Sequence, residues 1–175
     1  GTEPRLFSRP AGEARELQLY LPQRDAPDLL ISTSMCQAST LQALLGIDQV
    51  LDIYESLGAH PRGLAHRIEH FGLPDASQLA RAATLRVIAV PQTIFIHSLG
   101  RNFRSYLPDS FLPRTYPIRA MLDAGVRVAL SSDAPVVEDD DPLVGMMAAI
   151  TRRDNEGQCI AKEQAIDARE ALYLY

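Results

Sequence analysis

Several features that define whole classes of protein are missing from this 175-residue sequence. Its two cysteines, Cys36 and Cys159, do not form a CxxC pair, so they provide neither a disulfide framework nor a zinc knuckle. No apolar run approaches the roughly 18 residues that a membrane span requires, and residues 1–5 do not resemble a signal peptide. We therefore expect a protein without membrane association, in the reducing setting of the cytoplasm.

The sequence also lacks an excess of basic residues. It has 17 Lys and Arg against 22 Asp and Glu, which gives a net charge of −5 with neutral histidines. Such a chain offers no basic surface to a phosphate backbone, so a nucleic acid is not an expected partner and a small molecule or a protein is favoured. The 46% of hydrophobic and 22% of charged residues are typical of a globular domain rather than of a disordered segment.

Two regions of the chain differ in proline content and in hydrophobic periodicity. Residues 1–28 contain four prolines and no sustained periodicity, so we expect an irregular segment and assign it no function. No Gly- or Ser-rich linker divides residues 29–175, which we expect to form one domain. Short apolar runs in this domain predict strands near residues 29–33, 64–69, 86–91 and 126–131.

Amphipathic segments alternate with these strands. They predict helices over residues 41–57, 74–84, 118–124, 142–150 and 167–175, whereas residues 92–113 are expected to form a long loop. Asp141 is expected to cap the helix that begins at Pro142. Arg152 and Arg153 follow that helix, where positive charge is favourable against the helix dipole. The alternation predicts an α/β fold with a parallel sheet built from βαβ units.

Two of the predicted strands end on residues that can bind a metal. His70 ends the second strand and Asp133 follows the fourth, and the carboxyl ends of parallel strands meet at one face, where catalytic groups are found. Each residue also has a structural interpretation. His70 could be a histidine bonded to backbone, and Asp133 could be the cap of a turn.

Five strings stand in a fixed order along residues 47–175. They are His66-Arg67-Ile68-Glu69-His70, Val90-Pro91-Gln92, Asp123 to Val136, Asp141-Pro142-Leu143 and Ala148 to Arg153. In this order they resemble the C-terminal part of the family-three amidohydrolases, in the branch that is similar to N-substituted formamide deformylases.

This resemblance implies the C-terminal portion of a (β/α)8 TIM barrel, a metal-dependent hydrolase acting on amide-like C–N bonds of a small molecule. It implies a divalent metal, expected to be zinc, with His70 and Asp133 as ligands. Asp133 is then also the catalytic residue, which takes a proton from the attacking water. His97 and Arg101 fall where the family holds substrate-facing residues, although both could be exposed loop side chains.

The sequence departs from the family pattern in two places. It has no His-x-His motif, and Thr40 to Gly46 stand where the family carries a His-Ala-x-Gly-Asp string. The matched motifs supply two ligands, whereas a catalytic zinc site uses three protein ligands, and a whole barrel takes about 250 residues. We therefore expect a fragment that is inactive alone and forms a homo-oligomer or associates with the missing barrel segments. A non-catalytic α/β remnant or interaction module stays open as the alternative.

Overall fold

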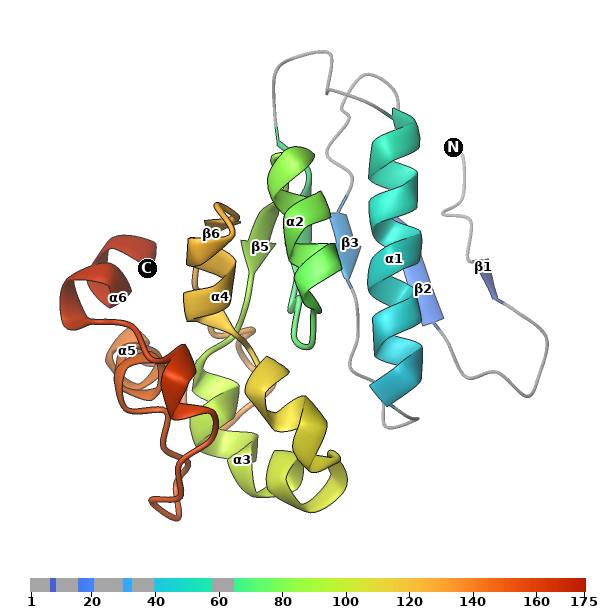
Figure 1. Cartoon of the computed structure of the whole chain (residues 1–175). Helices are drawn as coiled ribbons and strands as arrows, with labels where there is room; N and C mark the ends of the chain where they lie inside the picture. The colour runs from blue at the N-terminus through green and yellow to red at the C-terminus, as the bar shows by residue number, and fades with distance from the viewer. Residues whose placement is uncertain (1–6, 9–15, 21–29, 33–39, 58–64) are drawn as a thin grey trace.

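Six strands form one sheet in the computed structural model, which describes residues 7–8, 16–20, 30–32, 40–57 and 65–175 (Figure 1). The parallel part consists of β3 (Leu30–Ser32), β4 (Arg67–Glu69), β5 (Ile88–Val90) and β6 (Arg127–Val128), adjacent in that order. These are the four predicted strands, each shorter than the apolar run that predicted it. The parallel pairing of all four is confirmed.

Two further strands extend the sheet beyond β3. β1 (Phe7–Ser8) and β2 (Glu16–Tyr20) pair antiparallel, and β2 pairs antiparallel with β3, so that Leu19 lies opposite Ile31. The expectation that residues 1–28 are wholly irregular is wrong for these two strands. Each of these strands depends on pairing with a neighbouring strand, which the periodicity of a single segment does not reveal.

Five helices lie where the amphipathic segments predict them. Their bounds are α1 (Thr40–Leu57), α2 (Ala76–Thr84), α4 (Ile118–Asp123), α5 (Pro142–Thr151) and α6 (Ala168–Leu174). α2 begins after Asp75, which forms a capping box with Gln78, rather than at Pro74. Asp141 caps α5 as expected, because its side chain accepts a hydrogen bond from the Leu143 N–H.

The prediction of a long loop over residues 92–113 is wrong. This segment forms α3 (Ile94–Tyr106) and the 3-10 helix η1 (Asp109–Arg114). Ile94 and Phe103 of α3 are buried, and Gly100 lies against Asp154, so α3 packs closely on the segment that follows α5. Burial of this face stabilises a helix that Gly100 disfavours locally.

Two clusters of buried apolar side chains fill the structure. The larger joins α1, α2 and α4 to the sheet and includes Tyr54, Ile68 and Met121. The smaller lies around α3 and α5 and includes Phe95, Tyr116 and Ala148. Among the residues that the structure describes, no helix is long and apolar enough to cross a membrane.

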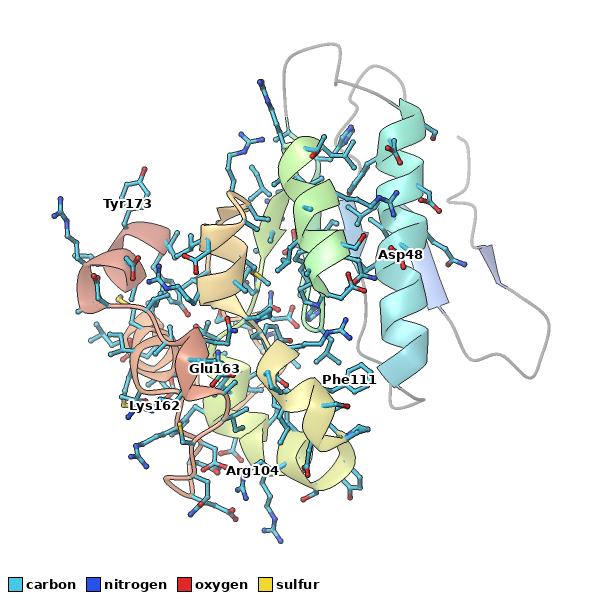
Figure 2. All side chains as sticks on the ribbon, in the orientation of Figure 1. Asp48, Arg104, Phe111, Lys162, Glu163 and Tyr173 are labelled. Atoms are coloured by element: carbon cyan, nitrogen blue, oxygen red, sulfur yellow. The ribbon has the colours of Figure 1, made fainter. Side chains whose placement is uncertain are left out.

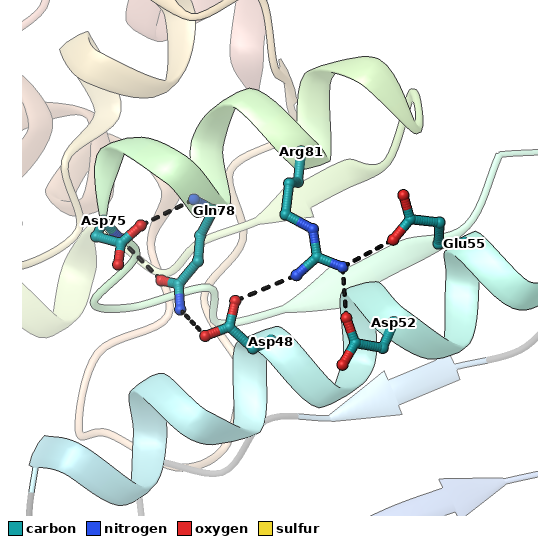
Figure 3. A network of polar contacts seen from close by, with 6 residues as sticks. All are labelled: Asp48, Asp52, Glu55, Asp75, Gln78 and Arg81. Atoms are coloured by element: carbon teal, nitrogen blue, oxygen red, sulfur yellow. Dashed lines mark hydrogen bonds and ion pairs between the residues drawn. The ribbon is translucent and has the colours of Figure 1, made fainter.

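A polar network joins the exposed sides of α1 and α2 (Figure 3). Arg81 of α2 binds three carboxylates of α1, with nitrogen–oxygen distances of 3.3 Å to Asp48, 2.6 Å to Asp52 and 3.0 Å to Glu55. Gln78 adds a hydrogen bond of 3.1 Å to Asp48. The network therefore holds α1 beside α2 over the apolar cluster that both helices cover.

Candidate functional site

The chain turns sharply where β4 ends. His70 and Phe71 both have positive φ angles, 65° and 45°, which break the alternation of side chains along the strand. The His70 N–H donates to the carbonyl oxygen of Val90 at 3.0 Å, which holds this turn against the tip of β5. Phe71 is buried, and the His70 side chain is 14% exposed at the carboxyl end of the sheet.

A second turn places Asp133 at the same end. Beyond β6 the chain continues along β5, because Ala129 donates to Ala89 at 3.0 Å and Ser131 donates to Pro91 at 3.1 Å. Asp133 has a φ angle of 56°, which carries the chain away from this ladder. Asp and Asn tolerate this conformation better than most residues do.

The two turns bring His70 and Asp133 together. His70 Nε2 lies 3.6 Å from Asp133 Oδ2. This separation is too long for an N–H···O hydrogen bond. It is close to the roughly 3.4 Å that separates two ligands of one tetrahedral zinc ion with bonds of about 2.0–2.1 Å. The expected convergence of the two side chains is therefore confirmed, whereas their roles as metal ligands stay a prediction.

Gln92 lies between the two turns, and the sequence motifs predicted no role for it. It is 1% exposed, and its Nε2 donates to Val90 O and to Ser131 Oγ, both at 2.8 Å. Gln92 Oε1 and His70 Nδ1 are both buried, and neither has a hydrogen-bond partner within the described part of the chain. An amide directly after a buried strand was the signal in the sequence that could have identified it.

Two aromatic residues, Phe95 and Tyr116, form an aromatic wall beside His70. The Phe95 ring stacks on the His70 imidazole with centroids 6.0 Å apart and meets the Tyr116 ring edge-on at 6.2 Å. Tyr116 is fully buried, and burial together with the negative charge of Asp133 raises the pKa of its phenol. The Tyr116 phenol therefore stays protonated at neutral pH, and its buried hydroxyl has no hydrogen-bond partner among the described residues.

Arg152 holds the Tyr116 backbone in place. Its guanidinium is buried and donates to Tyr116 O at 2.9 Å, Thr115 O at 2.6 Å and Ile160 O at 3.0 Å. Burial lowers the pKa of Arg152 to about 10, so the group is still charged at neutral pH. Arg152 lies at the end of α5 as expected, and its guanidinium is in addition a buried support of the residue beside the site.

His97 and Arg101 lie on α3 and not in a loop. The Nδ1 atom of His97 is buried without a partner among the residues described, and its carbonyl accepts the Asn155 N–H at 3.0 Å. Arg101 is 73% exposed, and its Nη1 lies 3.4 Å from Glu156 Oε1. The neighbouring Arg104, which lies toward the lower edge of Figure 2 and away from the strands, binds Asp154 at 2.6 Å. The substrate roles of His97 and Arg101 stay predictions.

The donor set fits two positions of a metal centre. A histidine nitrogen and a carboxylate oxygen are suitable ligands for zinc and for several other divalent metals. Within residues 40–57 and 65–175, and in the short strands that precede them, no group of three His, Cys, Asp or Glu side chains could hold a metal ion. A third ligand would therefore have to come from elsewhere in the protein.

Known proteins resemble this chain over the region that contains the site. A curated N-substituted formamide deformylase of Arthrobacter pascens is 32% identical over 131 residues, which are 74% of this chain and 24% of that protein. Crystal structures of uncharacterized metal-dependent hydrolases from Pyrococcus horikoshii OT3 and Pyrococcus furiosus match with TM-scores of 0.63 and 0.59, at 27% and 25% identity. Each match covers 75% of this chain, and 26% and 25% of those two chains.

The chain thus spans about a quarter of the length of these relatives. A model of the amidohydrolase family matches residues 43–175, which include His70, Gln92, Asp133 and the strands β4, β5 and β6 that position them. Since this match takes in most of the sequence, the chain belongs to the amidohydrolase family.

Proposed function

We propose that this chain supplies His70 and Asp133 to the active site of a metal-dependent hydrolase acting on amide-like C–N bonds. The observation that carries the proposal is their convergence, 3.6 Å apart, at the carboxyl end of a parallel sheet. The deformylase relative supports a C–N bond as the target, and the hydrolases with similar structures support a divalent metal. We take zinc as the metal and a small amide, such as an N-substituted formamide, as the substrate.

His70 would hold the ion through Nε2, and Asp133 would hold it through Oδ2. When bound, a divalent ion supplies Lewis acidity, which polarises the substrate carbonyl and makes water a nucleophile near neutral pH. The small exposed fraction of the His70 side chain, 14%, limits competition from solvent for this ligand. The larger exposed fraction of Asp133, 36%, leaves its carboxylate accessible to a reacting water.

Asp133 is the group that moves the proton. The oxygen of water attacks the carbonyl carbon, and Asp133 accepts the proton that this water releases. The carboxylic acid then returns the proton to the leaving nitrogen as the C–N bond breaks. The products are a carboxylic acid, which is formic acid for a formamide, and an amine, and Asp133 is again ionised.

The parallel strands β3 to β6, with both site residues beyond their carboxyl ends, support our proposal that the chain is the C-terminal portion of a (β/α)8 barrel. Formation of a homo-oligomer, association with the missing barrel segments and a cytoplasmic location all stay predictions. The alternative of a non-catalytic remnant is not better supported than the hydrolase: the described residues supply no third ligand, but His70 and Asp133 converge as a metal-binding pair would.

Zinc titration of the 175-residue chain, followed by calorimetry or by competition with a chromophoric chelator, tests the proposal. We expect weak binding of one ion, abolished by His70→Ala and by Asp133→Asn. His66→Ala is the matched control, because His66 precedes the same strand but stacks on Tyr54 with ring centroids 4.4 Å apart. Zinc binding that survives both site substitutions would overturn the assignment.

A further inference from the structure

The loop that follows His70 is held by a segment far along the chain. Three successive carbonyl oxygens of this loop accept hydrogen bonds from residues 114–116, at the end of η1, and they belong to Gly72, Leu73 and Pro74. The Tyr116 N–H donates to the first at 2.7 Å. Arg114 donates to the second through Nη2 at 2.8 Å and to the third through Nε at 3.1 Å. Two neighbouring residues therefore fix the loop relative to η1.

Arg114 is a half-buried cation whose hydrogen bonds go to neutral groups. Its guanidinium carbon lies 5.0 Å from the centroid of the Phe111 ring, which is labelled in Figure 2. Burial lowers the pKa of Arg114, and the charge of Asp75 acts in the opposite direction. A cation is removed from water at a cost unless its donors are used, and the two loop carbonyls use them. An apolar side chain here would leave both carbonyl oxygens without these donors.

The turn that opens this loop has a backbone conformation that needs outside support. His70 and Phe71 have consecutive positive φ angles of 65° and 45°, and neither is a glycine. Tyr116, which binds the loop, also has a positive φ angle of 44°. Bulky residues seldom adopt this region, because the Cβ atom comes too close to the backbone. Such a conformation persists where the surrounding structure enforces it, so contacts from outside the loop have to hold the turn.

Residues 114–116 are themselves anchored on their other side. The buried guanidinium of Arg152 donates to Thr115 O at 2.6 Å and to Tyr116 O at 2.9 Å. These bonds fix the backbone next to Arg114 to the end of α5. The segment that holds the loop is therefore tied to a helix on the far side of it, and can keep the loop in one place.

We propose that Arg114 is a positioning residue, which holds the left-handed turn at His70 and so directs the imidazole toward Asp133. The turn decides where this side chain lies, because side chains of an extended strand alternate between the two faces of the sheet and a left-handed residue departs from that alternation. The separation of 3.6 Å between His70 Nε2 and Asp133 Oδ2 is then a property of the turn that Arg114 supports.

The conformation of the turn is measured on the metal-free chain. The amide proton and the Hα of one residue lie closest together at positive φ, so a strong nuclear Overhauser effect between them identifies a left-handed residue. We expect this signal at His70 and Phe71 in the unmodified chain, and its weakening in Arg114→Met, which removes every side-chain donor. Arg86, with a φ angle of 55° in another turn, is the internal reference. Unchanged signals at His70 and Phe71 in Arg114→Met would overturn the proposal.

Arg119→Met is the matched control, because Arg119 of α4 binds Glu170 and Asp123 rather than the loop. The turn should persist in this variant. Its loss there as well would mean that a general loss of stability unsettles the turn, and would overturn the proposal. If Arg114→Met does not fold, Arg114→Lys decides, because one ammonium group cannot reproduce the planar fork that holds two carbonyls. Weaker signals from the turn in Arg114→Lys support the proposal, and unchanged signals overturn it.

Zinc titration of the same variants gives the functional measurement, and this step rests on the proposed hydrolase function. If the turn is populated about a tenth of the time without Arg114, the apparent dissociation constant for zinc should rise roughly tenfold in Arg114→Met. Arg119→Met should leave it unchanged. An unchanged zinc affinity in an Arg114→Met chain that has lost the turn would overturn the positioning role. A chain that binds no zinc, but loses the turn in Arg114→Met, would overturn the proposed function and leave the support of the turn by Arg114 standing.

Discussion

Arg152 Nη1 donates a hydrogen bond of 2.9 Å to the carbonyl oxygen of Tyr116, and so links the end of α5 to the aromatic wall of the site. Arg152 itself has a φ angle of 55° at the cap of α5, where its N–H donates to Ala148 O. Its three side-chain nitrogens reach three carbonyl groups in two separate segments of backbone. The local order around Tyr116 therefore depends on one buried cation.

Replacement of this cation should be strongly destabilising. Arg152→Met leaves the carbonyl groups of Thr115, Tyr116 and Ile160 without their buried donor. At about 1 kcal/mol for each carbonyl, we expect the free energy of unfolding to fall by about 3 kcal/mol, measured by urea denaturation. Arg153→Met is the matched control and should cost much less, because the Arg153 contact to Gly157 is exposed. Equal losses from the two variants would contradict the structural role of Arg152.

The network between α1 and α2 predicts a salt-dependent effect. Arg81 has its pKa raised, mainly by its bond to Asp52, and it balances three carboxylates (Figure 3). Arg81→Met should lower the free energy of unfolding by about 1 kcal/mol at low ionic strength and by less in high salt. A further Asp52→Asn substitution should recover part of the loss, since it relieves the repulsion among the remaining carboxylates. A loss that does not change with salt would argue against an ionic origin.

Glu170 predicts a pH dependence of stability. Its pKa is lowered, chiefly by the side chain of Arg119 and then by the Asp167 N–H. A carboxyl group with a depressed folded-state pKa stabilises the fold above its unfolded value of about 4.3, and this stabilisation disappears as pH falls through the folded value.

Glu170→Gln should therefore be less stable than the unmodified chain at neutral pH, by up to about 1 kcal/mol for this partly exposed pair. The two proteins should become equal in acid, once the pH has fallen below the depressed folded-state pKa of Glu170. Thermal unfolding followed at a series of pH values measures this difference. Arg119→Met should reproduce the same pH profile, and a difference that grows toward acid pH would show that the sign is wrong.

The 175-residue chain is expected to have no useful hydrolytic rate by itself. Two ligands hold an ion loosely, and the loss of oxyanion stabilisation by a second positioned donor costs about 3 kcal/mol, or roughly a hundredfold in rate. Assays with N-substituted formamides, run beside metal analysis of the purified chain, check this expectation. Stoichiometric, tightly bound zinc with turnover that Asp133→Asn abolishes would show that a ligand has been missed, and His97 would be the first candidate.

Local patterns in the sequence determined much of the fold. Short apolar runs were sufficient to locate β3 to β6, although β4 and β6 each retain one exposed arginine, Arg67 and Arg127. The helical period located α1, α2, α4, α5 and α6, and the Asp141-Pro142 pair identified the start of α5. The positions of His70 and Asp133 at strand ends identified them as candidate site residues. Chain order and strand direction together place those ends at one face of the sheet.

Tertiary contacts decided the rest. α3 is a helix because Ile94 and Phe103 are buried and Gly100 fits against Asp154, contacts that no local pattern contains. β1 and β2 exist through pairing with other strands of the sheet.

The environment of the site is non-local as well. Arg152 is buried only because three carbonyl groups surround its guanidinium, and Gln92 is oriented only because Val90 and Ser131 meet its amide nitrogen. Hydrogen bonds between segments far apart in the chain have no periodic signature, so the sequence alone cannot place them.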